Sequence, residues 1–184
     1  MDRTISIKKL TPETEKDFLA LKTDKSCGWC FCVAWHVPSW DGWDKRTAQE
    51  NREFREELFR QGKHDGYILY ENHAPVGFCQ CAPLEWFPKL VSQRGLKDEP
   101  ANTFVISCLE ILPSHRKRGL SRVLLQAVLA DLKTRDVPRV VAMPVEGSQP
   151  DGDIWTGPAA IFRANGFKIK KASDKYPLME LTLV

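Results

Sequence analysis

The sequence predicts a mixed α/β domain, and three observations lead to that prediction. A strongly apolar run at 103–112 is typical of a buried strand, a basic turn containing Gly119 follows it, and a long amphipathic stretch then predicts a helix. Shorter alternating runs on either side predict further strands, with helical segments between them. The resulting order β-α-α-β-β-β-α-β-α-β-β is consistent with one domain over residues 1–184.

The first part of the chain predicts a strand, two helices and a hairpin. Ile5 and Ile7 alternate with polar residues, which is typical of a half-buried strand. Thr11 and Pro12 predict a helix start, because a Thr side chain can cap free amides and Pro lacks the amide that would stay unpaired. The next predicted elements are a helix over 44–61 with a narrow apolar stripe, a strand over 67–71, a turn over 72–75 and a strand over 76–82.

The rest of the chain predicts a long connection, the strand–helix unit and a closing sheet. Residues 83–102 are polar and contain proline, so we expect a loop of the length that often forms a lid or binding wall. The elements predicted after it are strand 103–112, a helix over 116–136, strand 139–145, a Gly/Pro/Asp-rich loop, a helix over 157–165, and strands over 167–172 and 178–184.

Composition and charge limit the class of protein. With 42% hydrophobic and 28% charged residues, the sequence is typical of a water-soluble globular protein. No stretch approaches the roughly 18 apolar residues needed to cross a bilayer, and the N-terminal segment lacks the apolar core of a signal peptide. We therefore expect a cytoplasmic protein without a membrane partner. The net charge of +3 is small and the basic residues gather at one turn, which disfavours nucleic-acid binding.

The turn after strand 103–112 is a candidate anion site. Free backbone amides and the helix dipole at a helix N-terminus attract phosphate groups, and Gly119 lets the backbone approach a ligand closely. The side chains that add positive charge there are Arg116, Lys117, Arg118 and Arg122. On physical grounds alone, a phosphate or pyrophosphate site over 117–122 and an ordinary solvated turn are about equally favoured.

The stretch “ILPSHRKRGLS” resembles the acyl-CoA-binding signature of the GNAT superfamily of N-acetyltransferases. Ile111, Pro113, Arg116 and Gly119 match that signature, and Ser121 stands where the family prefers Gly or Ala. Downstream, “AAIFRANGFKI” resembles the second family signature, and “CGWCFCVAW” and “PVGFCQCAP” are similar to a subgroup rich in cysteine and tryptophan. The resemblance implies the GNAT fold: a central, mostly antiparallel sheet whose fourth and fifth strands splay apart, flanked by helices.

The same resemblance implies an N-acetyltransferase that uses acetyl-CoA as cosubstrate and passes the acetyl group directly to an amine. Small-molecule and peptide acceptors both stay open, as do a monomer and a homodimer. The resemblance places the CoA pyrophosphate on the backbone of 117–122 and the pantetheine arm along Leu109 to Ile111, with the Ile111 amide facing the thioester carbonyl. The implied cofactor-binding residues are Leu109, Ile111, Arg116, Lys117, Arg118, Gly119, Leu120, Ser121 and Arg122.

The residues that would move protons are less well defined. Glu110 alternates with its neighbours on the predicted cofactor strand, so its side chain is the candidate base, and a carboxylate paired with a basic neighbour is the equal alternative. Glu146 is a weaker candidate. Phe162 stands where many family members have the Tyr that protonates the CoA thiolate. Either the thiolate, with a pKa of about 8.5, leaves without much help, or Tyr176, a cysteine or water supplies the proton.

The segment between the first two predicted helices is rich in aromatic residues. The GNAT resemblance implies that it walls the acceptor site, which makes Trp29, Phe31 and Trp35 candidate acceptor-binding residues, with Trp40 and Trp43 nearby. Aromatic faces suit an apolar or cationic amine. Packing of these side chains into the core between the helices and the sheet is the open alternative.

The six cysteines do not fit one standard motif. Cys27 and Cys30 together with Cys79 and Cys81 have enough thiols for a zinc site, but their spacing is not that of a zinc ribbon. Buried packing is favoured over zinc binding or redox chemistry, because cysteine is among the most buried residue types. We therefore expect no metal, and a non-catalytic acyl-CoA sensor and a zinc-binding cysteine module remain as alternative functions.

Overall fold

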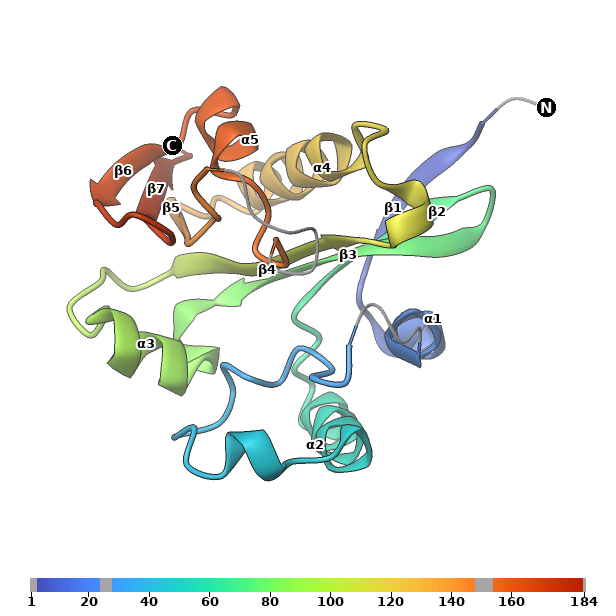
Figure 1. Cartoon of the computed structure of the whole chain (residues 1–184). Helices are drawn as coiled ribbons and strands as arrows, with labels where there is room; N and C mark the ends of the chain where they lie inside the picture. Colours follow the sequence, from blue (N-terminus) through green and yellow to red (C-terminus); the bar gives the residue numbers. More distant parts are fainter. Residues whose placement is uncertain (1–2, 24–27, 148–153, 184) are drawn as a thin grey trace.

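The computed structural model describes residues 3–23, 28–147 and 154–183 of the chain (Figure 1). Seven strands form one sheet in the order β1-β2-β3-β4-β5-β7-β6, in which β4 and β5 are parallel and every other pair is antiparallel. The strands are β1 Ile5–Lys9, β2 Gly66–Glu71, β3 Ala74–Pro83, β4 Thr103–Ile111, β5 Arg139–Ala142, β6 Lys168–Lys171 and β7 Leu178–Thr182. The helices are α1 Glu15–Thr23, α2 Ala48–Arg60, α3 Pro88–Arg94, α4 Leu120–Thr134 and α5 Ala159–Ala164. The mixed α/β fold class predicted from the sequence is confirmed.

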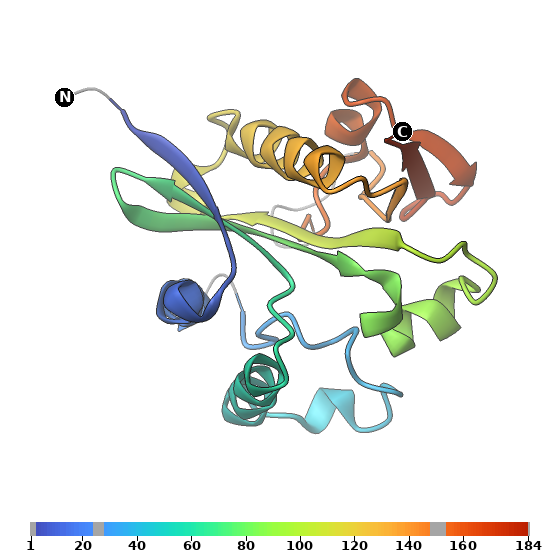
Figure 2. The same cartoon turned by 180° about the vertical axis from the view of Figure 1, so that it is seen from behind.

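The helices cover both faces of the sheet. Figures 1 and 2 show α4 and α5 on one face and α1, α2 and α3 on the other. A hydrophobic core lies on each face of the sheet, and successive strand residues point to opposite cores. Cys79 packs in the core beneath α4, whereas its neighbour Phe78 packs with Phe18 of α1. Among the described residues, no helix combines the length and the apolar character needed to cross a membrane.

Local chemistry explains where the first helices begin. At α2, the Thr47 amide donates to Glu50 Oε2 at 2.6 Å, and the Glu50 amide donates back to Thr47 Oγ1 at 3.2 Å. This reciprocal capping box satisfies two amides that have no partner inside the helix. The predicted start near Thr11 is a short 3-10 turn, Pro12–Thr14, that leads into α1.

The connection predicted as a loop over 83–102 contains a 3-10 turn, Leu84–Trp86, and the helix α3. Pro88 occupies the first turn of α3, and Gly95 ends it with a left-handed φ of 67°. Leu90 is fully buried against the sheet. A seven-residue helix is marginal on its own, so tertiary burial rather than local propensity explains its formation.

The parallel strands β4 and β5 separate part of the way along the sheet. Their pairing runs from Thr103 opposite Arg139 to Ile106 opposite Ala142 and then stops, while β4 continues to Ile111. The predicted strand 139–145 therefore ends early, and this separation is the expected splay of the fourth and fifth strands. It leaves one edge of the 107–111 segment unpaired by β5.

Candidate active site

A cavity of about 690 Å³ lies where β4, the turn before α4 and the loop after α1 meet. Its wall includes residues 108–111 of β4, the 115–117 and 119–121 parts of the turn, and 154–155 before α5. The loop between α1 and α2 contributes Gly28, Trp29, Cys30, Ala34, Trp40 and Trp43. A cavity of this volume is within the range that holds small-molecule ligands.

The turn before α4 has two residues with left-handed backbone. Lys117 has a φ of 59°, and Gly119, the N-cap of α4, has a φ of 76°. A Cβ at Gly119 would meet nothing within 4 Å, so its conformation, rather than packing inside the protein, explains the glycine. The amides of Leu120 and Ser121 start the helix, where amides have no partner in the helical ladder, and both residues line the cavity.

The basic side chains of this turn point in different directions. Arg116 Nε donates to the carbonyl of the last β4 residue at 2.9 Å and so ties the turn to the strand. Arg118 forms a two-pronged pair with Glu71 of β2, at 3.0 Å from Nη1 to Oε2 and 2.7 Å from Nη2 to Oε1. Lys117 lines the cavity, whereas Arg118 and Arg122 are exposed outside its lining. Positive side-chain charge at the cavity therefore comes from Arg116 and Lys117.

The splayed edge of β4 is partly occupied by the protein itself. The Leu109 amide, expected to face the pantetheine arm, donates to the Trp155 carbonyl at 2.8 Å. On the opposite edge, the Leu112 amide donates to Val76 of β3 at 2.9 Å. Because successive strand amides alternate between the two edges, the Ile111 amide faces the splayed side, as the Leu109 amide does.

Glu110 lies on the face of β4 that α1 covers, and its carboxylate pairs with Lys22 of α1. The Lys22 side chain is fully buried, and that of Glu110 is 10% exposed and lines the cavity. The Lys22 ammonium also lies over the rings of Phe18 and Phe78, at 5.6 and 5.2 Å from their centroids. Burial alone would lower the pKa of Lys22, but the adjacent thiol groups of Cys32, Cys108 and Cys30 outweigh it and raise that pKa. Lys22 and Glu110 thus form a buried ion pair at the cavity wall.

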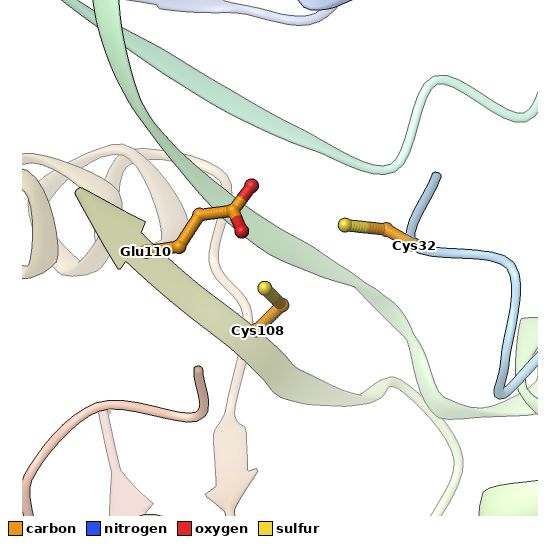
Figure 3. A group of neighbouring side chains, drawn as sticks. All are labelled: Cys32, Cys108 and Glu110. Carbon is orange, nitrogen blue, oxygen red and sulfur yellow. The ribbon is translucent and has the colours of Figure 1, made fainter. Parts of the chain in front are cut away.

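Three cysteines surround this ion pair. The sulfurs of Cys32 and Cys108 and a carboxylate oxygen of Glu110 all lie within 4.8 Å of one another (Figure 3). Hydrogen bonds from Cys108 and Cys30 lower the pKa of Cys32 well below its usual value, and the same bonds raise the pKa values of the two donors. Cys30 and Cys108 also line the cavity.

The cysteines singled out from the sequence as a four-thiol set do not come together. Cys79 and Cys81 of β3 pack beneath α4, on the opposite face of the sheet from Cys32 and Cys108. Cys27 lies outside the described residues. The structure instead groups Cys108, which no cysteine spacing singled out, with the 30–32 segment; Cys108 and Glu110 share a face because they are two residues apart on a strand.

A buried polar network holds the loop that carries these cysteines. Phe31 and Cys32 have left-handed φ values of 43° and 53°, which are uncommon for residues with side chains. Arg55 of α2 donates from Nε to the Phe31 carbonyl at 3.0 Å and from Nη2 to the Cys32 carbonyl at 2.7 Å. Arg55 also donates to Asp65 at 2.6 Å, and Gln80 donates to the same carboxylate at 2.6 Å. These contacts fix the uncommon turn.

The tryptophans separate into two groups. Trp29, Trp40, Trp43 and Trp155 line the cavity, and the Trp29 and Trp43 ring centroids are 5.3 Å apart. Trp35 is buried in the core beside α3 and does not line it.

Phe31 is also placed outside the cavity lining. Its left-handed backbone directs the side chain into the core with Phe18 and Leu58. Of the three residues predicted to bind the acceptor, Trp29 therefore lies at the cavity, while Phe31 and Trp35 pack in the core.

The other residues that the sequence links to proton transfer lie outside the cavity lining. Phe162 is fully buried and packs edge-on against Phe167, at 5.2 Å between centroids. Tyr176 is outside the cavity lining, with Arg94 over its ring. Glu146 pairs with Arg163 at the surface.

Comparison with known proteins places these features in a family. The sequence matches the model of the Acetyltransferase (GNAT) family over residues 29–150, which is more than half of the chain. A comparison with curated protein sequences gives no significant match.

Similar solved structures cover nearly the whole chain. An N-acetyltransferase from Staphylococcus aureus Mu50 has 18% identity and a TM-score of 0.58, over 98% of this chain and 99% of that one. PaiA N-acetyltransferase from Thermoplasma acidophilum, in complex with coenzyme A, has 15% identity and a TM-score of 0.58, over 97% and 99%. The ribosomal-protein-S18-alanine N-acetyltransferase from Escherichia coli has 14% identity and a TM-score of 0.57, over 98% and 94%. These likenesses concern the fold, and together with the family match they show that the chain belongs to the GNAT acetyltransferase family.

Proposed function

We propose that the protein transfers the acetyl group of acetyl-CoA to an amine by direct attack on the thioester. The observation that carries the proposal is that one cavity is lined by the left-handed turn before α4, by the end of β4 and by tryptophan side chains. A phosphate-bearing donor and an amine can therefore be held side by side, which lowers the entropic cost of reaction. The CoA complex of the similar Thermoplasma acidophilum structure supports acetyl-CoA as the cosubstrate.

The backbone supplies the electrostatic part of this proposal. The amides at Leu120 and Ser121 would bind the pyrophosphate at the N-terminus of α4. The Ile111 amide, on the splayed edge, would donate to the carbonyl oxygen as it becomes an oxyanion. Because the Leu109 amide is already bonded to Trp155, the pantetheine arm would contact the strand nearer to Ile111.

Glu110 is the proposed proton acceptor. An incoming ammonium group must lose a proton before it can attack, and an ionised carboxylate on the cavity wall can take it directly or through water. The buried Lys22 ammonium holds the carboxylate in place at the cavity wall. When the carbon–sulfur bond breaks, CoA leaves as a thiolate with an ordinary pKa of about 8.5, so departure does not require the tyrosine that Phe162 replaces.

The tryptophans define the acceptor class that the cavity favours. Trp29, Trp40 and Trp43 offer indole faces, and Glu110 is the carboxylate among the described lining residues. An amine attached to an apolar or aromatic body would pack against these rings and present its nitrogen to the carboxylate.

The free thiols favour a reducing compartment. Cys30, Cys32, Cys79, Cys81 and Cys108 are all unpaired, although Cys32 lies close to two other thiols. Disulfides persist mainly in oxidising environments. We accordingly expect the enzyme to act in the cytoplasm.

A non-catalytic acyl-CoA sensor is the second candidate, favoured by the apolar Phe162 in place of a proton donor. Two measurements separate the candidates. Saturating acetyl-CoA should raise the melting temperature, because a ligand of the native state stabilises it, and CoA should be released with at least one apolar primary amine. Stabilisation without CoA release across a panel of amines would favour the sensor, and no stabilisation would contradict both.

A further inference from the structure

We infer that Cys32, Cys108 and Glu110 form a binding site for a thiophilic divalent metal ion of the zinc class. Thiolate and carboxylate groups are both zinc ligands. The three ligand atoms come from two elements far apart in sequence, the 30–32 turn and β4, and they converge beside the cavity (Figure 3).

The spacing fits one ion. Zinc binds sulfur at about 2.3 Å and carboxylate oxygen at about 2.0–2.2 Å, so two ligand atoms of one ion are at most about 4.6 Å apart. All three atoms of the cluster are within 4.8 Å of one another. Small side-chain rotations at Cys32, Cys108 and Glu110 would therefore complete the coordination.

The supporting structure holds the ligands in place. Cys108 and Glu110 are fixed by β4, and the Cys32 backbone is fixed by the donated hydrogen bonds of Arg55 and Gln80 to its carbonyl, both at 2.7 Å. Zinc prefers four ligands, and three leave one position open. The neighbouring Cys30 thiol or a molecule in the cavity can fill that position, and the cavity gives an ion its entry path.

Lys22 provides the charge that such a site requires. Two thiolates and one carboxylate carry three negative charges, so a divalent ion leaves a net charge of −1 in a buried place. The fully buried Lys22 ammonium, now paired with Glu110, would neutralise that charge. The ion and the ammonium would thus balance the charge of the cluster together.

Metal binding would compete with acetyl transfer, and this consequence rests on the proposed function. An ion on Glu110 occupies the carboxylate that we propose as the proton acceptor. We therefore expect zinc to inhibit CoA release at the concentration at which it binds. The binding site itself does not depend on whether the protein is an acetyltransferase.

Titration of the reduced, metal-free full chain with Co²⁺ and Zn²⁺ tests the site. We expect one ion per chain, a near-ultraviolet thiolate-to-cobalt charge-transfer band, and displacement of Co²⁺ by Zn²⁺. Cys32→Ser and Cys108→Ser should each weaken binding at least about tenfold. Cys79→Ala is the matched control, because it alters a buried thiol on the opposite face of the sheet and should leave binding unchanged. Circular dichroism checks that each variant is folded.

A measurement on the unaltered protein keeps the inference testable if the serine variants fail to fold. Zinc should protect Cys32 and Cys108 from alkylation, as read by peptide mass spectrometry, whereas alkylation of Cys81 should not respond to zinc. The inference would be overturned by the absence of a thiolate-to-cobalt band, by unchanged affinity in a folded Cys32→Ser variant, or by protection confined to other cysteines. Zinc binding to a protein whose metal-free form releases no CoA with any amine of the panel would retain the metal site and reject the proposed function.

Discussion

Two buried charged clusters lie on the same side of the sheet, and they differ in what surrounds them. In the first, Arg55, Asp65 and Gln80 bond to one another and to the backbone of the 31–32 turn. In the second, Lys22 and Glu110 pair among thiols at the cavity wall. The first cluster satisfies its polar atoms internally and supports the fold. The second exposes a carboxylate and two thiols to the cavity, where chemistry can use them.

The largest effect on stability should come from breaking the first cluster. Asp65→Asn leaves the fully buried Arg55 guanidinium without its counter-charge, so we expect about 3–5 kcal/mol lower unfolding free energy. Urea denaturation at pH 7 measures it. Arg52→Met on α2, the helix that carries Arg55, is the control, because the pair of Arg52 with Glu56 is exposed and its loss should cost less than about 1 kcal/mol. Equal losses in the two variants would contradict the supporting role of this cluster.

The largest effect on activity should come from the second cluster. Glu110→Gln removes the proposed proton acceptor but keeps the shape of the side chain, so we expect the rate of CoA release to fall about a hundredfold. Acetyl-CoA affinity should stay within about twofold, because the cofactor turn is not altered. Glu146→Gln changes a surface carboxylate paired with Arg163 and should keep full activity. Full activity in the Glu110 variant would remove it as the base.

The two clusters should also respond differently to acid. Burial raises the pKa of Asp65, but Arg55, His36 and Gln80 outweigh it and lower that pKa below the value of about 3.9 expected when unfolded. A lowered folded pKa contributes stability that is complete above the unfolded pKa and is lost as pH falls below it. The difference in unfolding free energy between wild type and Asp65→Asn should therefore shrink as the pH is lowered from about 6 to about 3. This range spans the unfolded pKa of about 3.9. A difference independent of pH would contradict the charge assignment.

A smaller effect is expected at the aromatic wall. Trp29→Ala removes a 47% exposed ring at the cavity, so the KM for an apolar amine should rise about tenfold with little change in stability. Steady-state kinetics with varied amine measure this. Trp86→Ala, which alters a partly buried tryptophan outside the cavity lining, should leave KM unchanged. An equal rise in both variants would argue against an acceptor site at Trp29.

Much of the fold could be predicted from the sequence because its strands and long helices have clear periodicity. Strand 103–112 and the long helix after it correspond to β4 and α4, and the hairpin corresponds to β2 and β3. The helix α3 was missed, because seven residues with little intrinsic helical stability depend on the burial of Leu90. Such burial depends on tertiary contacts, which no local pattern contains.

The site was less predictable because its decisive contacts join distant residues. The alternation of residues along the strand predicts the face on which Glu110 lies, and it is compatible with either a free base or a carboxylate paired with a basic residue. Nothing local in the sequence identifies Lys22 as that partner. The orientation of Phe31 depends on a left-handed turn held by Arg55, which propensity does not indicate.

The most direct test of the proposed cofactor site compares acetyl-CoA binding by two variants, Gly119→Ala and Gly95→Ala. Both glycines have left-handed φ values, 76° and 67°, and an added Cβ would meet nothing within 4 Å at either site. The backbone strain should therefore be similar, while the Gly119 variant alone places a methyl group at the proposed pyrophosphate site. We predict that isothermal titration calorimetry will show affinity at least about tenfold weaker for Gly119→Ala and unchanged for Gly95→Ala. Wild-type affinity in a folded Gly119→Ala variant would contradict the proposed cofactor site.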